Sequence, residues 1–228
     1  MSLDDTVPAG EAARMLGTSP QRVRALISAG ELPGTKVAGR WLVDRASVDR
    51  RLRSAKLTGR PLSSSQAWGL IAMAEGRTPT WLRADERSRL RALLRDRTIS
   101  DIIPLLVRRA RKLDLRAHAS DLSRIESEPD VVRTGVSAAA EYELAVVAPG
   151  VLEAYVPDRR LAQLERTYRL QPTANANLVL HVVGEPWPFT AGQWFAPRLA
   201  TIIELLADDE QRTRRAGQDA LADFMAAR

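Results

Sequence analysis

The chain has 228 residues, 45% of them hydrophobic, which is enough for a packed core in one large domain or two small ones. It has no cysteine, which excludes a disulfide framework and a thiolate metal site. No stretch approaches the roughly 18 uncharged apolar residues of a membrane helix, and the acidic start MSLDDTVPAG lacks the apolar segment of a signal peptide. We therefore expect a cytoplasmic bacterial protein with no membrane partner.

The net charge of +6 is distributed unevenly along the chain. Residues 1–60 carry 11 Lys and Arg against 6 Asp and Glu, a net of +5, and residues 61–120 carry 12 against 6, a net of +6. Residues 121–228 carry 11 against 16, a net of −5. This division favours a polyanion as the partner of the first half. Most basic residues are arginine, which suits phosphate and base-edge contacts, although a GC-rich genome would produce the same preference.

The first 30 residues predict two short helices joined by a tight turn. An extended start at Val7 leads into a helix that ends at Gly17. Ser19 is a favourable N-cap and Pro20 occupies the first helical position, where its missing N–H costs nothing. Gly30 ends the second helix, and its buried stripe consists of Val23, Leu26 and Ile27.

A two-stranded hairpin and a third helix follow. Residues 35–43, TKVAGRWLV, alternate around an Ala38–Gly39 turn. Asp44 then caps a helix. We assign to its inward side Ala46, Val48 and Leu52, and to its outward side Arg50, Arg51 and Arg53.

Two helices, a hairpin wing and a third helix make a winged helix-turn-helix, the arrangement that reads the major groove of double-stranded DNA. The first turn of the second helix has no bulky apolar side chain, so Arg there can reach guanine and Gln can reach adenine. Basic residues near the wing tip are placed for phosphates or an adjacent minor groove. The predicted DNA-binding residues are Ser19, Gln21, Arg22, Arg24, Ala25, Lys36, Arg40 and Arg45.

Residues 6–53 also resemble the excisionase and MerR-type helix-turn-helix domains. The resemblance is carried by AARMLGTSPQRV, in the pattern A-A-x-x-L-G-x-S-x-x-x-V, by GELP before the wing and by GRWLV after it. It implies DNA binding through the second helix and the wing, with Trp41 and Leu42 in the core of the wing. The alternative is a winged helix that serves as a dimer or protein interface.

Residues 58–65, at the end of KLTGRPLSSS, predict a linker. Beyond it we expect helices over residues 64–76, 83–96 and 100–113, the last capped by Ser100 with Pro104 in its first turn. One array of arginines either extends the DNA footprint or forms a solvated face paired with Asp85, Glu86 and Asp96. It consists of Arg83, Arg87, Arg89, Arg91, Arg95 and Arg97.

From about residue 113 the pattern becomes mixed α/β. The expected strands cover residues 113–118, 131–135, 142–147, 151–156 and 176–183, and the expected helices cover residues 158–170, 197–208 and 209–227. Four aromatic residues either pack in a crossover or form an exposed patch for a partner protein: Trp187, Phe189, Trp194 and Phe195.

The segment from Tyr142 onward resembles the C-terminal part of actinobacterial regulators and of AbiEi-like antitoxins of type IV toxin–antitoxin systems. YVP before a helix, PWPF, and AP before a further helix carry this resemblance. It implies autorepression through the winged helix and a second domain that counteracts a nucleotidyltransferase-like toxin. The N-terminal module departs from the pattern, because it is closer to the excisionases.

The sequence contains no recognisable pattern for catalysis, a cofactor or a metal. His118 and His181 are the only histidines, and we interpret both as hydrogen-bonded side chains at strands rather than zinc ligands. Ser120 and Ser137 lack a G-x-S-x-G context and are interpreted as helix caps. The acidic pairs Asp208–Asp209 and Glu126/Glu128 are assigned to helix edges or loops. We expect no enzyme, no catalytic residue, no cofactor and no metal.

These patterns predict an α+β protein with a winged helix-turn-helix in residues 1–57 and a linker in residues 58–65. Residues 66–228 would form a helical segment and a mixed α/β effector or assembly domain. We expect a sequence-specific transcriptional regulator, a homodimer that binds operator DNA at its own promoter, antitoxin-like, with a toxin protein as a second partner. The alternatives are an excisionase-like recombination or architectural factor and a protein-interaction module that neutralises a toxin.

Overall fold

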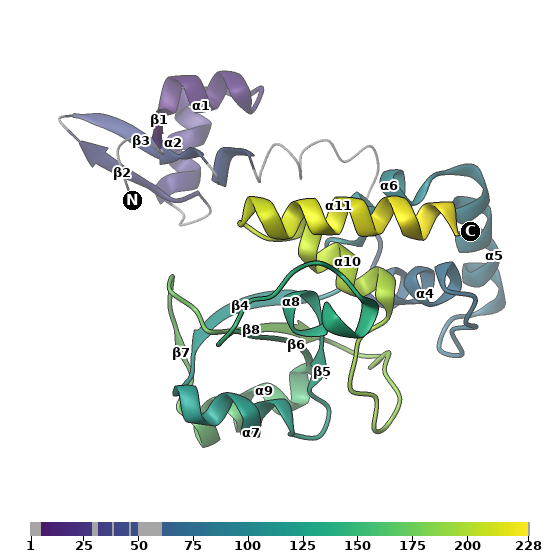
Figure 1. Ribbon diagram of the computed structural model, residues 1–228. Helices are drawn as coiled ribbons and strands as arrows, with labels where there is room; N and C mark the ends of the chain where they lie inside the picture. Colours follow the sequence, from purple (N-terminus) through teal and green to yellow (C-terminus); the bar gives the residue numbers. More distant parts are fainter. Residues whose placement is uncertain (1–5, 29–31, 38, 46, 50–60, 228) are drawn as a thin grey trace. The chain divides into compact units, whose positions relative to one another are not determined.

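The computed structural model describes residues 6–28, 32–37, 39–45, 47–49 and 61–227. The chain divides into two compact units, Met1–Arg60 and Pro61–Arg228, called unit 1 and unit 2 below. Unit 1 is a small helical domain with a three-stranded sheet, and unit 2 is a larger α/β domain (Figure 1). The mixed α/β class predicted from the sequence is confirmed.

Unit 1 begins with strand β1 (Thr6–Pro8), helix α1 (Ala9–Met15) and helix α2 (Pro20–Ser28), followed by strands β2 (Gly34–Val37) and β3 (Arg40–Asp44). The sheet order is β1-β3-β2, and both pairs are antiparallel. The sequence predicted a two-stranded hairpin, but Val7 pairs with Val43 and adds a third strand. This pairing ties the start of the domain to the wing and covers one edge of β3.

The turn between α1 and α2 follows from its residues. Gly17 has a φ of 61°, a left-handed conformation that glycine adopts without cost. The N–H of Thr18 bonds to the carbonyl of Ala13 at 2.9 Å, and the N–H of Gly17 bonds to that of Arg14 at 3.3 Å, which is a Schellman motif. Ser19 then caps α2, because its Oγ accepts the N–H of Arg22 at 3.2 Å. The predicted helix end and helix cap are confirmed.

The third helix is described at residues 45 and 47–49. Asp44 caps it as expected, accepting the Ser47 N–H at 2.7 Å, and Val48 is fully buried. Several residues assigned from the sequence lie outside the described residues: Gly30, Ala38, Ala46, Arg50, Arg51, Leu52 and Arg53. The core of unit 1 brings both helices, the sheet and Val48 together through Val7, Ala9, Ala12, Ala13, Val23, Leu26, Leu32, Val43 and Val48.

Unit 2 opens with helices α4 (Ser64–Ala74), α5 (Ala84–Asp96) and α6 (Ile99–Ile102) and the 3₁₀ turn η2 (Ile103–Leu106). Two expectations are corrected here. Ser63 is the N-cap of α4, so residues 63–65 belong to the start of a helix and not to a linker. The helix expected over residues 100–113 is capped by Thr98 instead of Ser100 and ends at Ile102, and residues 111–116 form a strand.

The sheet of unit 2 has the order β5-β6-β8-β4-β7, with β6 and β8 parallel and the other pairs antiparallel. Its strands are β4 (Arg111–Arg116), β5 (Val132–Arg133), β6 (Leu152–Pro157), β7 (Gln171–Pro172) and β8 (Leu178–Val183). The strand expected over residues 142–147 is wrong: a 3₁₀ turn, η4 (Ala140–Tyr142), is followed there by irregular chain. Leu144 packs on the core from this chain, while Val147 is 84% exposed.

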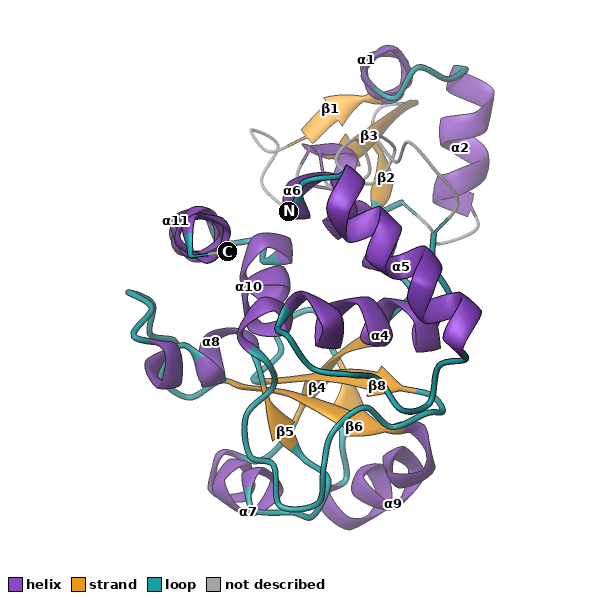
Figure 2. Cartoon of the chain, turned by 90° about the vertical axis from the view of Figure 1, so that its right-hand side faces the viewer, coloured by secondary structure: helices purple, strands orange, loops and turns teal. Residues whose placement is uncertain are grey.

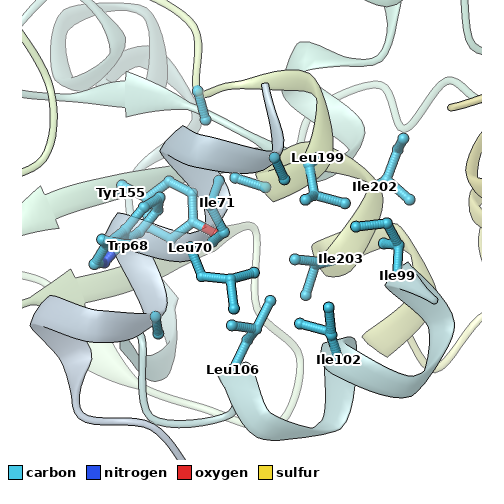
Figure 3. Close-up of a cluster of buried hydrophobic side chains, with 14 of the residues drawn as sticks. Trp68, Leu70, Ile71, Ile99, Ile102, Leu106, Tyr155, Leu199, Ile202 and Ile203 are labelled. Atoms are coloured by element: carbon cyan, nitrogen blue, oxygen red, sulfur yellow. The ribbon is translucent and has the colours of Figure 1, made fainter. Parts of the chain in front are cut away.

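Helices cover both faces of this sheet (Figure 2). One face carries α7 (Leu122–Glu126), which follows the 3₁₀ turn η3 (Ala119–Asp121), and α9 (Asp158–Tyr168). The other face carries α4, α8 (Gly135–Ala138) and α10 (Arg198–Ala207), and α11 (Gln211–Ala226) packs on α10. Figure 3 shows the core on this second face, where Trp68 and Tyr155 meet edge to face with ring centroids 5.0 Å apart. Within the described residues, no helix is both long and apolar enough to span a bilayer.

Candidate nucleic-acid interface

Helix α2 presents one face to its own domain and the opposite face outward. Val23 and Leu26 are buried and Ile27 is half-buried, so they hold the helix to the core. At about 100° per residue, the direction opposite this stripe is occupied by Gln21 and Ala25. Both are exposed, as the sequence predicted. The outward face therefore starts in the first turn of the helix, where a recognition helix contacts bases.

Two arginines flank this outward face. Arg22 and Arg24 are exposed and lie on opposite sides of the Gln21–Ala25 line when the helix is viewed along its axis. A guanidinium on each side can reach a base edge or the phosphate backbone of a DNA strand, while Gln21 lies between the two arginines. Ser19 is also exposed, but its hydroxyl is engaged as the helix cap. The α2 face is defined here as Gln21, Arg22, Arg24 and Ala25.

The register of the wing separates the two basic residues predicted near its tip. Lys36 pairs with Trp41, and Arg40 pairs with Val37. Residues directly opposite each other share a face and neighbours along a strand alternate, so Lys36 and Arg40 point to opposite faces of the hairpin. Both are exposed. They can therefore meet different phosphates, but they cannot line one face of the wing together.

Arg45 is the remaining predicted DNA contact, and Trp41 and Leu42 are the residues that the sequence assigned to the core of the wing. Arg45, at the start of the third helix, is exposed. Trp41 is half-buried against the core of unit 1, in agreement with the expectation that it belongs to the wing rather than to a DNA surface. Leu42 is half-buried and pairs with Thr35. Every predicted DNA-binding side chain is thus exposed on the described part of unit 1.

Unit 2 contains a buried polar network between its sheet and α10, which the sequence analysis missed. Arg109 lies 2.7 Å from Glu204, and the hydroxyl of Tyr155 donates to the same carboxylate. His181 contacts two carboxylates: its Nε2 lies 2.9 Å from Glu153 Oε1, and its Nδ1 lies 3.5 Å from Glu204 Oε2. Ionisable residues inside the apolar stretches VLEAYV and TIIELLA were the available signal.

Distances alone would allow Glu153, His181 and Glu204 to share a cation. Their atoms are already engaged, however. One oxygen of Glu204 accepts from Arg109 and Tyr155, and one oxygen of Glu153 accepts the N–H of Val136 at 3.0 Å. The two ring nitrogens of His181 face different carboxylates, so one ion could not replace both contacts. The arrangement is a network of hydrogen bonds and ion pairs that joins two layers of the fold.

Other side chains considered from the sequence lie apart from this network. His118 is exposed and accepts the N–H of Ser120, so the histidine is the cap there and the serine is not. Ser137 is no cap either, because its Oγ accepts the N–H of Glu153 at 2.8 Å. The aromatic residues after β8 are mixed: Phe189 is buried in the core, whereas Trp194 is 50% exposed.

The comparisons with known proteins agree with the fold of unit 1. Residues 9–56 match the family model of the helix-turn-helix domain. No curated protein and no solved structure matches the chain. Unit 1 is therefore a DNA-binding helix-turn-helix domain of the kind found in regulators and excisionase-like factors. The sequence-based prediction of a helix-turn-helix domain is confirmed.

Proposed function

We propose that the protein is a sequence-specific transcriptional regulator that binds operator DNA through the α2 face and represses its own promoter. The observation that carries the proposal is the placement of Gln21 between Arg22 and Arg24 on the outward face of α2. Arg recognises guanine and Gln recognises adenine, each by a bidentate pair worth roughly 1–3 kcal/mol of discrimination. Lys36, Arg40 and Arg45 supply phosphate contacts around this reading surface.

Homodimerisation is part of the proposal. In unit 1, α2 is the helix whose outward face is placed to read bases. One copy of the chain therefore offers a single recognition helix. Two linked copies bind two half-sites as one event and gain affinity without new contacts. We assign the contact between the two copies to unit 2, which is the larger of the two units.

A purely architectural, excisionase-like role is the alternative that the helix-turn-helix match also fits. Unit 2, which spans Pro61–Arg228, favours the regulator, because DNA bending by a winged helix needs no separate α/β domain. An antitoxin role is a narrower version of the regulator. Its support is the net charge of −5 in residues 121–228, which suits a basic protein partner.

Footprinting of the full chain on the DNA upstream of its gene tests the proposal. We expect two protected half-sites whose centres lie about 10 bp, or a multiple of it, apart. A row of adjacent sites that fill cooperatively would favour the architectural role instead. Absence of protection at every upstream position would contradict autoregulation.

A further inference from the structure

A basic hollow lies on unit 2, and none of its lining residues belongs to the polar network. Its volume is about 400 Å³, and it is formed by the C-terminal end of α4, the loop that follows, and the second half of α5. Met73 and Leu94 are half-buried and provide apolar surface. The exposed polar residues of the lining are Arg77, Thr78, Arg91 and Arg95. No carboxylate is among the described residues that line it.

Two of the three arginines of the hollow are only weakly neutralised. Arg77 is the exception, because it lies 3.5 Å from the mostly buried carboxylate of Glu75. Arg95 lies 3.5 Å from Asp96, but both side chains are mostly exposed, and pairs of that kind contribute little. The side chain of Arg91 makes no ion pair or hydrogen bond with any residue that the structure describes. The hollow therefore keeps an excess of positive charge.

This clustering opposes stability in the free protein. Arg91 and Arg95 are four residues apart on one helix, a spacing at which like charges repel, and Arg77 brings a third guanidinium to the same hollow. The dipole of α5 favours Arg95 in the last turn, but it does not account for Arg77 in the loop. An anion bound in the hollow would remove the repulsion. Guanidinium groups match the oxygens of a phosphate in bidentate geometry, and the Thr78 hydroxyl is a further donor.

We propose that the hollow between α4 and α5 is a phosphate-binding site, with Arg77, Arg91 and Arg95 as its ligands. The phosphate is either a backbone phosphate of DNA or that of a phosphorylated small molecule that regulates the protein. The DNA source rests on the proposed function, and the small-molecule source does not. In either case unit 2 takes part directly in the recognition of an anion.

The test compares three forms of the full chain: the natural protein, R91Q/R95Q, and R83Q/R89Q as a control. The control removes one charge from α5 and one from its N-cap residue, but Arg83 and Arg89 do not line the hollow and both pair with Asp85. Circular dichroism melting shows that each variant is folded. Calorimetric titration with inorganic pyrophosphate measures the free-phosphate arm, and the salt dependence of binding to an upstream DNA duplex measures the DNA arm.

If the phosphate is free, pyrophosphate binds the natural protein and the control, and R91Q/R95Q loses at least about tenfold in affinity, or about 1.4 kcal/mol. If the phosphate belongs to DNA, pyrophosphate binds none of the forms. The slope of log K against log salt then falls by about 1.8 in R91Q/R95Q alone, about 0.9 for each lost contact. Equal behaviour of the two variants in both arms overturns the site. Failure of the natural protein to prefer upstream DNA would count against the proposed function, while the pyrophosphate arm would still decide the small-molecule site.

Discussion

Arg109 and Glu204 form a buried ion pair whose charged atoms lie 2.7 Å apart, with side chains that are 10% and 3% exposed. Arg109 follows the 3₁₀ turn η2, and Glu204 belongs to α10. Its guanidinium also bonds to the carbonyl of Leu106 at 3.2 Å, and its own carbonyl accepts the indole N–H of Trp68 at 2.9 Å. One residue thus connects the α4 and η2 layer to α10 and, through Tyr155, to the sheet.

Removal of either partner should destabilise unit 2 strongly. Arg109→Met leaves the carboxylate of Glu204 buried without its cation, and we expect a loss of about 3–5 kcal/mol in the free energy of unfolding. Asp85→Asn is the control, since it breaks the exposed 3.0 Å pair with Arg89 and should cost less than about 1 kcal/mol. Urea unfolding followed by circular dichroism measures both. Equally small losses of unfolding free energy in both variants would mean that the buried pair contributes little to the stability of unit 2.

The carboxylate of Glu204 should make the stability of unit 2 depend on pH in the acidic range. Burial by itself raises the pKa of Glu204, but the charges of Arg109 and His181 and hydrogen bonds from Tyr155 and Arg109 outweigh it, so the pKa lies below the usual 4.5. A lowered pKa in the folded state contributes stability above pH 4.5, and that contribution is lost as the pH falls through the folded value. The difference in unfolding free energy between the natural protein and Glu204→Gln should therefore shrink below pH 4.5. A difference that stays constant from pH 7 to pH 3 would rule out this linkage.

The carboxylate of Glu153 leaves no room for a side chain at Gly135. Its φ is +50°, and a Cβ added there would overlap that carboxylate, which also contacts His181. Gly135→Ala should therefore cost more than the 1–2 kcal/mol of the backbone conformation alone, and we expect about 3 kcal/mol. Gly192→Ala is a matched control, because its φ is +76° and nothing lies within 4 Å of its added Cβ. Thermal melting of the two variants separates the cost of the steric overlap from the cost of the backbone conformation.

The cap of α2 should be measurable separately from DNA contact. Ser19→Ala removes the acceptor for the Arg22 N–H and should raise the exchange rate of the α2 amide hydrogens by an amount equivalent to about 1 kcal/mol. Ser19→Asp should restore protection, since aspartate caps equally well. If Ser19→Asp exchanged as fast as Ser19→Ala, the cap would not be what stabilises the start of α2.

Residues on α2 and on the wing should affect DNA binding differently. Arg22→Ala should weaken binding to the operator by roughly 1–3 kcal/mol and relax the sequence preference. Lys36→Ala should weaken binding to all sequences about equally and reduce the salt slope by about 1. Titration of each variant into operator and scrambled duplexes distinguishes the two. An Arg22→Ala protein with unchanged specificity would show that α2 is not oriented toward the bases.

Local signals in the sequence predicted unit 1 well, because its elements are bounded by residues that act on their immediate neighbours. Gly17 ends α1, Ser19 starts α2 and Asp44 starts the third helix, each through contacts within five residues. The pairing of Val7 with Val43 escaped prediction, because only long-range contact determines where a three-residue strand pairs.

Unit 2 was predicted less well for the same reason. Residues 142–147 alternate like a strand, but their backbone bonds locally: the N–H of Leu144 bonds to the carbonyl of Ala139 and the N–H of Val146 to that of Leu144. Arg109 lies in the basic run RRARK and gave no sign of burial, since its partner Glu204 is 95 residues away. Of the arginine array on and beside α5, the structure pairs Arg83 and Arg89 with Asp85 and Arg95 with Asp96, so the paired-face interpretation holds for these members. Arg91 lines the hollow, and contact of the array with DNA stays a prediction.

Fluorescence anisotropy of the full chain on its own upstream DNA is the direct test of sequence-specific recognition by the α2 face. The same titration on a scrambled duplex of equal length, at two salt concentrations, supplies the reference. A sequence-specific regulator should prefer the upstream DNA by a thousandfold or more, roughly the lower end for specific binders, and should keep a preference at the higher salt. Weak binding that is equal on both duplexes and disappears at the higher salt would contradict sequence-specific recognition by the α2 face.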